Sequence, residues 1–81
     1  MTAHWYISVY DRKTERLVTE ELLGDVSSDA VRQTFEAEPD AVGGFEVLAS
    51  HIPFITLHSS VDVDLSECIA FVELLEDENQ L

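Results

Sequence analysis

The chain has few cationic side chains: four Lys and Arg residues stand against 17 Asp and Glu among its 81 residues. The formal net charge is −13, whereas nucleic acids and anionic membranes both attract a basic surface. The charge therefore argues against nucleic acid and membranes as direct partners. It favours a basic partner, for example a protein that itself binds nucleic acid, and solubility alone is the other explanation.

Cysteine and long apolar segments are also scarce. Cys68 is the single cysteine, so an internal disulfide is impossible and a reducing compartment fits the chain. The first ten residues, MTAHWYISVY, lack the basic and apolar regions of a signal peptide. The apolar runs are too short to span a bilayer. We therefore expect a soluble, cytoplasmic protein without an export signal of its own.

The length permits a single domain with a small core, which we predict over residues 1–81. The apolar content of 46% is that of a globular chain rather than a disordered one. The last residues, from about 76 to 81, are predicted to form an acidic, solvated tail.

Signatures of catalysis are weak. The three histidines, His4, His51 and His58, lie in different segments, and their spacing matches no zinc motif. Cys68 has no local base and no second cysteine, so we expect a small buried hydrophobe rather than a nucleophile. We predict that the protein is not an enzyme and has no catalytic residue, no metal and no cofactor.

The first 23 residues predict a β-hairpin. Residues 4–10 (HWYISVY) alternate in an extended pattern, residues 11–15 (DRKTE) suit a turn, and RLVTEELL continues as a second strand. With Tyr10 opposite Leu17, one face is apolar and carries Trp5, Val9, Val18 and Leu22. The other face carries Tyr6, Tyr10, Leu17, Thr19 and Glu21. Ile7 then lies opposite Glu20, a conflict that a β-bulge or an early end of the pairing would resolve.

A short helix is predicted after the hairpin. Ser27 or Ser28 can cap it, and Pro39 ends it. Phe35 belongs to its apolar face and is expected in the core. Strands follow at FEVLAS (45–50) and CIAFVELL (68–75), with Pro53 ending or kinking the former. Residues 54–60 remain ambiguous between loop, irregular helical turn and edge segment, and VDVDLS (61–66) suggests an exposed edge.

This order predicts an α+β fold, with a four-stranded antiparallel β-sheet and one short α-helix packed on one face. One short helix cannot cover both faces, so the other face stays open to solvent or to a partner. Its predicted occupants are Tyr6, Tyr10, Leu17, Glu21, Glu46 and Leu48. Aromatic and acidic side chains on one open face are typical of a surface that binds a basic protein.

Three segments resemble the cloacin-type immunity proteins, which inhibit ribosome-inactivating colicins, cloacin and related pyocins. They are WYISVYDRKTERLVTEELL (5–23), GGFEVLASHIPF (43–54) and VDVDLSECIAFVEL (61–74). The family pattern D-K-x-T-E at the first hairpin is matched by residues 11–15, with Arg12 and Lys13 in its second and third positions. The pattern G-x-F-[DE]-V-[IL]-A is matched by residues 43–49. The ordered set covers nearly the whole chain and implies the same sheet-and-helix fold.

The resemblance implies a function. Such a protein binds the C-terminal cytotoxic domain of its own toxin as a 1:1 heterodimer. That domain cleaves small-subunit ribosomal RNA, so it is basic, and the inhibitor binds beside its active site and blocks its access to the ribosome. The inhibitor stays in the cytoplasm of the producing bacterium and is released in complex with the toxin. The implied partner-binding residues are Tyr10, Asp11, Glu15, Leu17, Glu20, Glu21, Gly44, Phe45 and Glu46.

Partner choice in the family is thought to be tuned at the position of Gly44, where glycine offers no side-chain anchor. His51 stands where the compared family member has an aromatic residue, and the last strand is less aromatic than in the family. Both departures favour a different cognate toxin of the same class, for example a pyocin-like one.

Two points stay open from the sequence. Three of the four cations, Arg12, Lys13 and Arg16, lie at the hairpin tip, where they can pair locally with Asp11 and Glu15 or meet an acidic patch on the toxin. We favour the local role. The alternative function is an acidic nucleic-acid mimic that inhibits another basic nucleic-acid-binding protein. An enzyme subunit or small-molecule binder is a third, weaker candidate.

Overall fold

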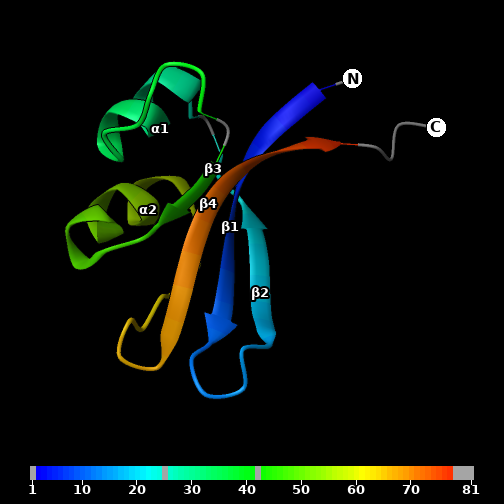
Figure 1. Cartoon of the computed structure of the whole chain (residues 1–81), viewed down its shortest axis with the longest axis vertical. Helices are drawn as coiled ribbons and strands as arrows, with labels where there is room; N and C mark the ends of the chain where they lie inside the picture. The colour runs from blue at the N-terminus through cyan, green and yellow to red at the C-terminus, as the bar shows by residue number, and fades with distance from the viewer. Residues whose placement is uncertain (1, 25, 42, 78–81) are drawn as a thin grey trace.

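The fold is one four-stranded antiparallel sheet with short helices on one face, seen in a computed structural model that describes residues 2–24, 26–41 and 43–77 (Figure 1). The elements in order are β1 (Thr2–Asp11), β2 (Leu17–Leu22), α1 (Ser28–Thr34), β3 (Gly43–Glu46), the 3₁₀ helix η1 (Ala49–His51), α2 (Ile52–His58) and β4 (Cys68–Asp77). The strand order is β2-β1-β4-β3. The predicted α+β class and the antiparallel sheet are confirmed.

The β1–β2 hairpin contains a bulge that decides which side chains of β2 face the helices. Tyr10 lies opposite Leu17, as predicted, but Val9 lies opposite Thr19, so Val18 has no partner in β1. The extra residue shifts the remainder of β2 by one position. Glu20 therefore lies opposite Ser8, which removes the expected conflict with Ile7.

The bulge makes four predicted placements wrong. Val18 and Leu22 were expected on the apolar face, but they are 58% and 50% exposed. Thr19 and Glu21 were expected on the open face, but they lie opposite Val9 and the fully buried Ile7, on the side of the helices. A shift of one residue reverses the facing of every later side chain in a strand.

Two short helices cover the sheet where the sequence predicted one. Helix α1 starts as expected, because the Ser27 hydroxyl accepts a hydrogen bond from the backbone N–H of Ala30 at 3.1 Å. It ends at Thr34, several residues before Pro39. Residues 52–58 form α2, which takes up most of the segment 54–60 that the sequence left ambiguous. Pro53 was expected to end or kink a strand, but it lies in the first turn of α2, where the missing N–H removes no helical hydrogen bond.

The remaining boundaries also differ from the sequence prediction. β3 is a four-residue strand, Gly43–Glu46, rather than a strand over 45–50, and residues 61–66 form no strand. Glu76 and Asp77, predicted in the tail, belong to β4, and residues 78–81 lie outside the described residues. Cys68 opens β4 as expected and is only partly buried.

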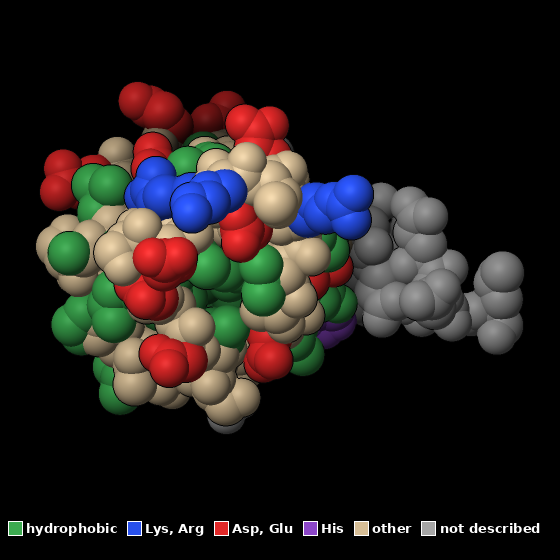
Figure 2. All heavy atoms as spheres, turned by 90° about the horizontal axis from the view of Figure 1, so that it is seen from below, with side chains coloured by type: hydrophobic (Ala, Val, Ile, Leu, Met, Phe, Trp, Pro, Cys, Tyr) green, Lys and Arg blue, Asp and Glu red, His purple; other side chains and the backbone are tan. Residues whose placement is uncertain are grey.

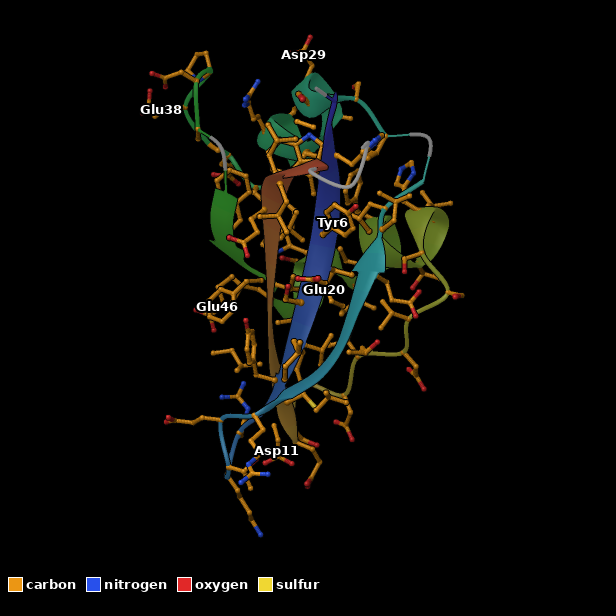
Figure 3. All side chains as sticks on the ribbon, turned by 90° about the vertical axis from the view of Figure 1, so that its right-hand side faces the viewer. Tyr6, Asp11, Glu20, Asp29, Glu38 and Glu46 are labelled. Carbon is orange, nitrogen blue, oxygen red and sulfur yellow. The ribbon has the colours of Figure 1, made fainter. Side chains whose placement is uncertain are left out.

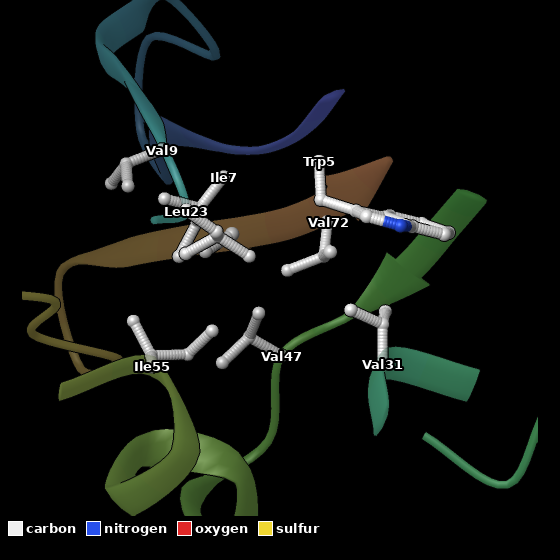
Figure 4. Close-up of a cluster of buried hydrophobic side chains, with 9 residues drawn as sticks. Trp5, Ile7, Val9, Leu23, Val31, Val47, Ile55 and Val72 are labelled. Atoms are coloured by element: carbon white, nitrogen blue, oxygen red, sulfur yellow. The ribbon is translucent and has the colours of Figure 1, made fainter. Parts of the chain in front are cut away.

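The core lies between the sheet and the helices (Figure 4). Its buried members are Trp5, Ile7, Val9, Leu23, Val31, Val47, Ile55, Ala70 and Val72. The Trp5 indole N–H donates to the Ser28 hydroxyl at 2.9 Å, so its one polar atom is satisfied. Phe35 packs against this core, as predicted. No helix among the described residues covers the outer face of the sheet, and the candidate site lies there.

Candidate protein-binding face

The outer face of the sheet carries alternate residues of all four strands (Figure 3). We call this surface the open face. The residues that the strand register places on it are His4, Tyr6, Ser8 and Tyr10 of β1, Leu17, Glu20 and Leu22 of β2, Gly43 and Glu46 of β3, and Ile69, Phe71, Glu73 and Leu75 of β4. Gly44 lies in the register shift of β3 and has no partner in β4. The set mixes aromatic, aliphatic and acidic side chains, which suits a protein interface better than a catalytic centre.

Two tyrosines organise the open face. Tyr10 lies between Leu17 on β2 and Ile69 on β4, and its ring meets the Phe71 ring edge-to-face with centroids 6.2 Å apart. Tyr6 lies between Leu22 and Glu73. Both tyrosines are only partly buried, so their rings combine firm packing with an accessible surface.

Between the tyrosines, a hydrogen bond orders the centre of the face. The Ser8 hydroxyl, which is 1% exposed, donates to the Glu20 carboxylate at 3.0 Å. This contact satisfies a buried polar group and fixes an exposed carboxylate on the open face.

A groove of about 700 Å³ opens on this face beside the hairpin tip. Its lining residues are Tyr10, Asp11, Arg12 and Glu15 from the hairpin, Ile69, Phe71 and Glu73 from β4, and Gly44 from β3. β4 is the strand between β1 and β3, so its three residues lie across the middle of the groove. The groove joins an apolar centre to carboxylates at its edges.

Two glycines shape the β3 side of the groove. Gly43 has φ +140°, and a Cβ atom there would lie 2.3 Å from the Glu73 Cβ atom. Its bare backbone therefore allows β3 to approach β4 next to Glu73. Gly44 has φ +78°, and a Cβ atom there would meet nothing within 4 Å, so open space lies beside it.

Backbone contacts hold the hairpin tip in place. The Asp11 carboxylate accepts hydrogen bonds from the backbone N–H groups of Lys13 and Thr14 at 2.8 and 3.0 Å. Arg12 donates from its guanidinium Nε to the Leu65 carbonyl at 3.0 Å, and its backbone N–H donates to the Glu67 carbonyl. Arg12 thus has a local role, but its acceptors are backbone carbonyls of the loop before β4 rather than the expected carboxylates of Asp11 and Glu15.

Three of the four cationic side chains, Arg12, Lys13 and Arg16, gather at this end of the molecule, whereas Arg32 belongs to α1. Figure 2, seen from the hairpin end, shows them in a band with acidic side chains above and below it. The remaining surface in this view is a mixture of apolar and acidic side chains. The three cations of the hairpin therefore form a narrow strip on a strongly acidic protein.

The turn at Asp11 gives a pH-dependent prediction. The backbone N–H donors of Thr14 and Lys13 hold the pKa of Asp11 below its ordinary value of 3.8. Because this pKa is lowered in the folded state, the stabilising contribution is present above pH 3.8 and is lost as the pH falls through the lowered pKa. An NMR titration should give a carboxyl midpoint below 3.8, with the Lys13 and Thr14 amide shifts following it.

The control for that titration is Asp11→Asn, which keeps a side-chain acceptor for the turn and removes the titrating group. In this variant the two amide shifts should no longer change over the acid range. A midpoint at or above 3.8 in the parent protein would contradict the assigned hydrogen bonds.

The structure brings together four of the nine implied partner-binding residues, namely Tyr10, Asp11, Glu15 and Gly44, as lining of the groove. Leu17, Glu20 and Glu46 lie elsewhere on the open face. Glu21 does not belong to this face, because the bulge turns it toward the helices.

Phe45 is also misplaced by the sequence-based assignment. It pairs with the buried Val72 and stacks on Trp5 and Phe35, with ring centroids 5.9 and 5.5 Å apart. Its ring therefore contributes to the core and not to the open face. Leu48, predicted on the open face, follows β3 outside the sheet and is 52% exposed.

Sequence reasoning missed Ile69, Phe71 and Glu73, which occupy the middle of the groove. The sequence does carry the strand alternation that puts these three residues on one face, since they alternate with the buried Ala70 and Val72. The segment CIAFVELL, however, is apolar on both sides of that alternation and gives no indication of which set faces outward.

Within residues 2–24, 26–41 and 43–77, no three His, Cys, Asp or Glu side chains are grouped to hold a metal ion. His51 accepts from the Leu48 N–H through Nδ1 and so caps the start of η1. The His58 Nδ1 lies 2.9 Å from the Gly24 carbonyl and joins α2 to the segment after β2. No helix in the described part of the chain is long and apolar enough to cross a membrane.

Comparison with family models matches residues 4–73 to a family described as Domain of unknown function (DUF7683). The chain belongs to this family. The match extends from β1 through Glu73 and so includes every residue that lines the groove. A search of curated proteins gave no match for the DUF7683 chain.

Proposed function

We propose that this DUF7683 protein is a bacteriocin immunity protein. It binds the basic, ribosomal-RNA-cleaving nuclease domain of a cognate colicin or pyocin in a 1:1 complex and neutralises it. The observation that carries the proposal is the open face, where partly buried aromatic rings and carboxylates lie together on a chain of net charge −13. The sequence resemblance to the cloacin-type immunity proteins supports the same conclusion.

Charge provides the first physical argument. A domain that cleaves ribosomal RNA must bind phosphates and therefore presents a basic surface. A strongly acidic inhibitor is attracted to that surface at long range, which accelerates association and makes it sensitive to salt. The net charge of −13 weakens the folded state by self-repulsion, so a use in recognition accounts for its retention.

The open face provides the second argument. Tyrosine side chains in firmly packed, accessible positions are the commonest anchors of protein interfaces, and Tyr10 has that environment. Leu17, its cross-strand neighbour, is 53% exposed and extends the apolar patch. The surrounding carboxylates, including Glu20 and Glu46, supply the charged rim.

Inhibition on this proposal requires no catalytic residue. The bound protein lies beside the nuclease active site and prevents docking on the ribosome by its bulk and its negative charge. It acts in the cytoplasm of the producing bacterium and leaves with the toxin as a complex. Cofactors and metals have no part in this mechanism.

The test is in vitro translation with purified cytotoxic domains of several ribosome-cleaving colicins and pyocins, each with and without the protein. We expect one domain to be neutralised at a molar ratio near one to one, with the complex weakening as salt is raised. Absence of protection and of a complex on a sizing column, across the set, would overturn the proposal.

One observation favours a second candidate, an acidic nucleic-acid mimic that inhibits another basic nucleic-acid-binding protein. Acidic side chains are not confined to the open face, since Asp29 and Glu38 lie at the opposite end of the molecule from Asp11 (Figure 3). A mimic would bind many basic proteins with similar affinity, whereas an immunity protein selects one. Binding measured against a panel of unrelated basic proteins separates the two functions.

A further inference from the structure

We propose that the groove on the open face is a receptor for a single arginine side chain of the partner, with Glu73 as its carboxylate and the Tyr10–Phe71 pair as its aromatic wall. This inference rests on the proposed function only for the identity of the partner. The recognised group follows from the lining of the groove itself. The inference adds Ile69, Phe71 and Glu73 to the partner-binding residues that the sequence resemblance implied.

The charge of the lining selects a cation. Three carboxylates, those of Asp11, Glu15 and Glu73, line the groove with one guanidinium, that of Arg12. The Arg12 Nε donates to the Leu65 carbonyl, which holds this side chain toward the loop before β4. Hydrogen bonds from backbone N–H groups lower the pKa of Asp11, so this carboxylate stays negative throughout the neutral range.

The aromatic pair favours arginine over lysine. Tyr10 and Phe71 lie edge-to-face in the lining, with Ile69 beside Tyr10 on the neighbouring strand. A guanidinium is planar and weakly hydrated, so it stacks on aromatic rings while it donates to a carboxylate. An ammonium group is a strongly hydrated point charge and gains less from such a wall.

The position of Glu73 suits this role because the backbone on both sides of it is fixed. It lies opposite Tyr6 on β1 and opposite Gly43 on β3, within the two central ladders of the sheet. The missing side chain of Gly43 permits this close pairing. A carboxylate on a paired strand is held in place better than one on a loop, so it loses little conformational entropy on binding.

Gly44 leaves room for the incoming group. It lines the groove, and its Cβ position has no neighbour within 4 Å. A side chain at this position would reduce the space available next to Glu73. The residue at position 44 therefore sets how large a group can enter the groove.

The first experiment uses a probe that is independent of any toxin. Capped arginine (N-acetyl-arginine amide) is titrated into the labelled protein and followed by backbone amide NMR, with capped lysine and capped citrulline in parallel. We expect millimolar binding of the arginine compound, with shifts concentrated at Tyr10, Gly44, Ile69, Phe71 and Glu73. Capped lysine should bind several-fold more weakly, and citrulline, which is neutral, should leave these amides unchanged.

Three variants make the experiment specific. Glu73→Gln should weaken capped arginine about tenfold, since it removes one charge-assisted contact. Gly44→Asn, which fits a positive φ, should weaken it similarly by filling the groove without a change in charge. Glu38→Gln removes the same charge at an exposed position that does not line the groove and should have no effect on the shifts or the affinity.

A second experiment, which measures binding of the cognate nuclease domain, distinguishes failure of this inference from failure of the proposed function. Glu73→Gln should raise the dissociation constant of the cognate nuclease domain about 10- to 100-fold, chiefly through faster dissociation. If that domain binds the parent protein and Glu73→Gln equally well, the groove assignment is wrong while the immunity function stands. If capped arginine selects the groove but no nuclease domain binds, the groove assignment stands and the immunity function fails. Shifts spread evenly over the acidic surface, or equal binding of lysine, would overturn the assignment to arginine.

Discussion

Gly43→Ala is expected to separate β3 from β4 and to lower the free energy of unfolding by about 2–6 kcal/mol. Two effects combine in this estimate. The backbone at φ +140° is in a region that other residues rarely adopt, at a cost of about 1–3 kcal/mol. The new Cβ atom would also lie 2.3 Å from the Cβ atom and 2.5 Å from the Cα atom of Glu73, and overpacking of this kind costs about 1–3 kcal/mol.

The clash at Gly43 cannot be relieved by a side-chain rotation, because the Glu73 atoms that it meets belong to the backbone and its first carbon. The strand itself has to move. A domain of 81 residues has a total stability of roughly 4–12 kcal/mol, so this one methyl group removes a large part of it. The loss should be measured by urea unfolding monitored by the fluorescence of Trp5, which stacks on Phe45 of β3.

Gly44→Ala is the matched control, because it makes the same chemical change one residue along the strand. Its Cβ atom would meet no neighbour within 4 Å, so only the backbone at φ +78° is strained, at about 1–2 kcal/mol. The two variants should therefore differ by the overpacking cost, about 1–3 kcal/mol. Equal losses would show that the close approach of β3 to Glu73 does not hold in the folded protein.

The hairpin shows how far local sequence patterns determine this fold. The alternation of residues 4–10 and the turn at 11–15 are enough to pair Tyr10 with Leu17, and the structure has that pair. The same alternation fails beyond Val18, because a bulge inserts one residue without a distinct sequence signal. The expected clash of Ile7 with Glu20 was the one indication that the register had to shift.

The second helix was harder to predict because its residues support more than one conformation. Residues 52–58 (IPFITLH) contain β-branched residues and a proline, which by propensity disfavour a helix interior. Tertiary packing decides the outcome: Ile55 is 1% exposed, and the Gly24 N–H donates to the His58 carbonyl, which joins the end of α2 to the end of β2. These contacts lie between segments that are distant in sequence.

The candidate site was predictable only in part for a related reason. Tyr10, Asp11, Glu15 and Gly44 belong to recognisable short patterns, and the groove contains all four. Glu73 carries no such pattern, and its importance arises from the strand order β2-β1-β4-β3, which places β4 between the hairpin and β3. Strand order is a property of the whole chain and cannot be obtained from one segment.

The double variant Tyr10→Ala/Leu17→Ala is expected to weaken binding of the cognate nuclease domain by about 10²–10³-fold, on the function proposed above. Tyr10 is anchored by its edge-to-face contact with Phe71, and Leu17 lies directly across the strand pair from it. Loss of both side chains removes the central apolar patch and leaves a charged rim, which steers association but adds little affinity. Calorimetric titration at two salt concentrations measures the effect.

Each single variant is also required, because neighbouring side chains couple. Tyr10 and Leu17 are cross-strand partners, so the double variant should lose less than the sum of the two single losses. Leu57→Ala is the control: this side chain is 80% exposed on α2, away from the open face, and its truncation should leave the affinity unchanged. Because cross-strand pairs contribute only about 0.2–1 kcal/mol to stability, the double variant should stay folded. If it binds the nuclease domain as tightly as the parent protein while Leu57→Ala does not, the interface lies on the helical side of the molecule.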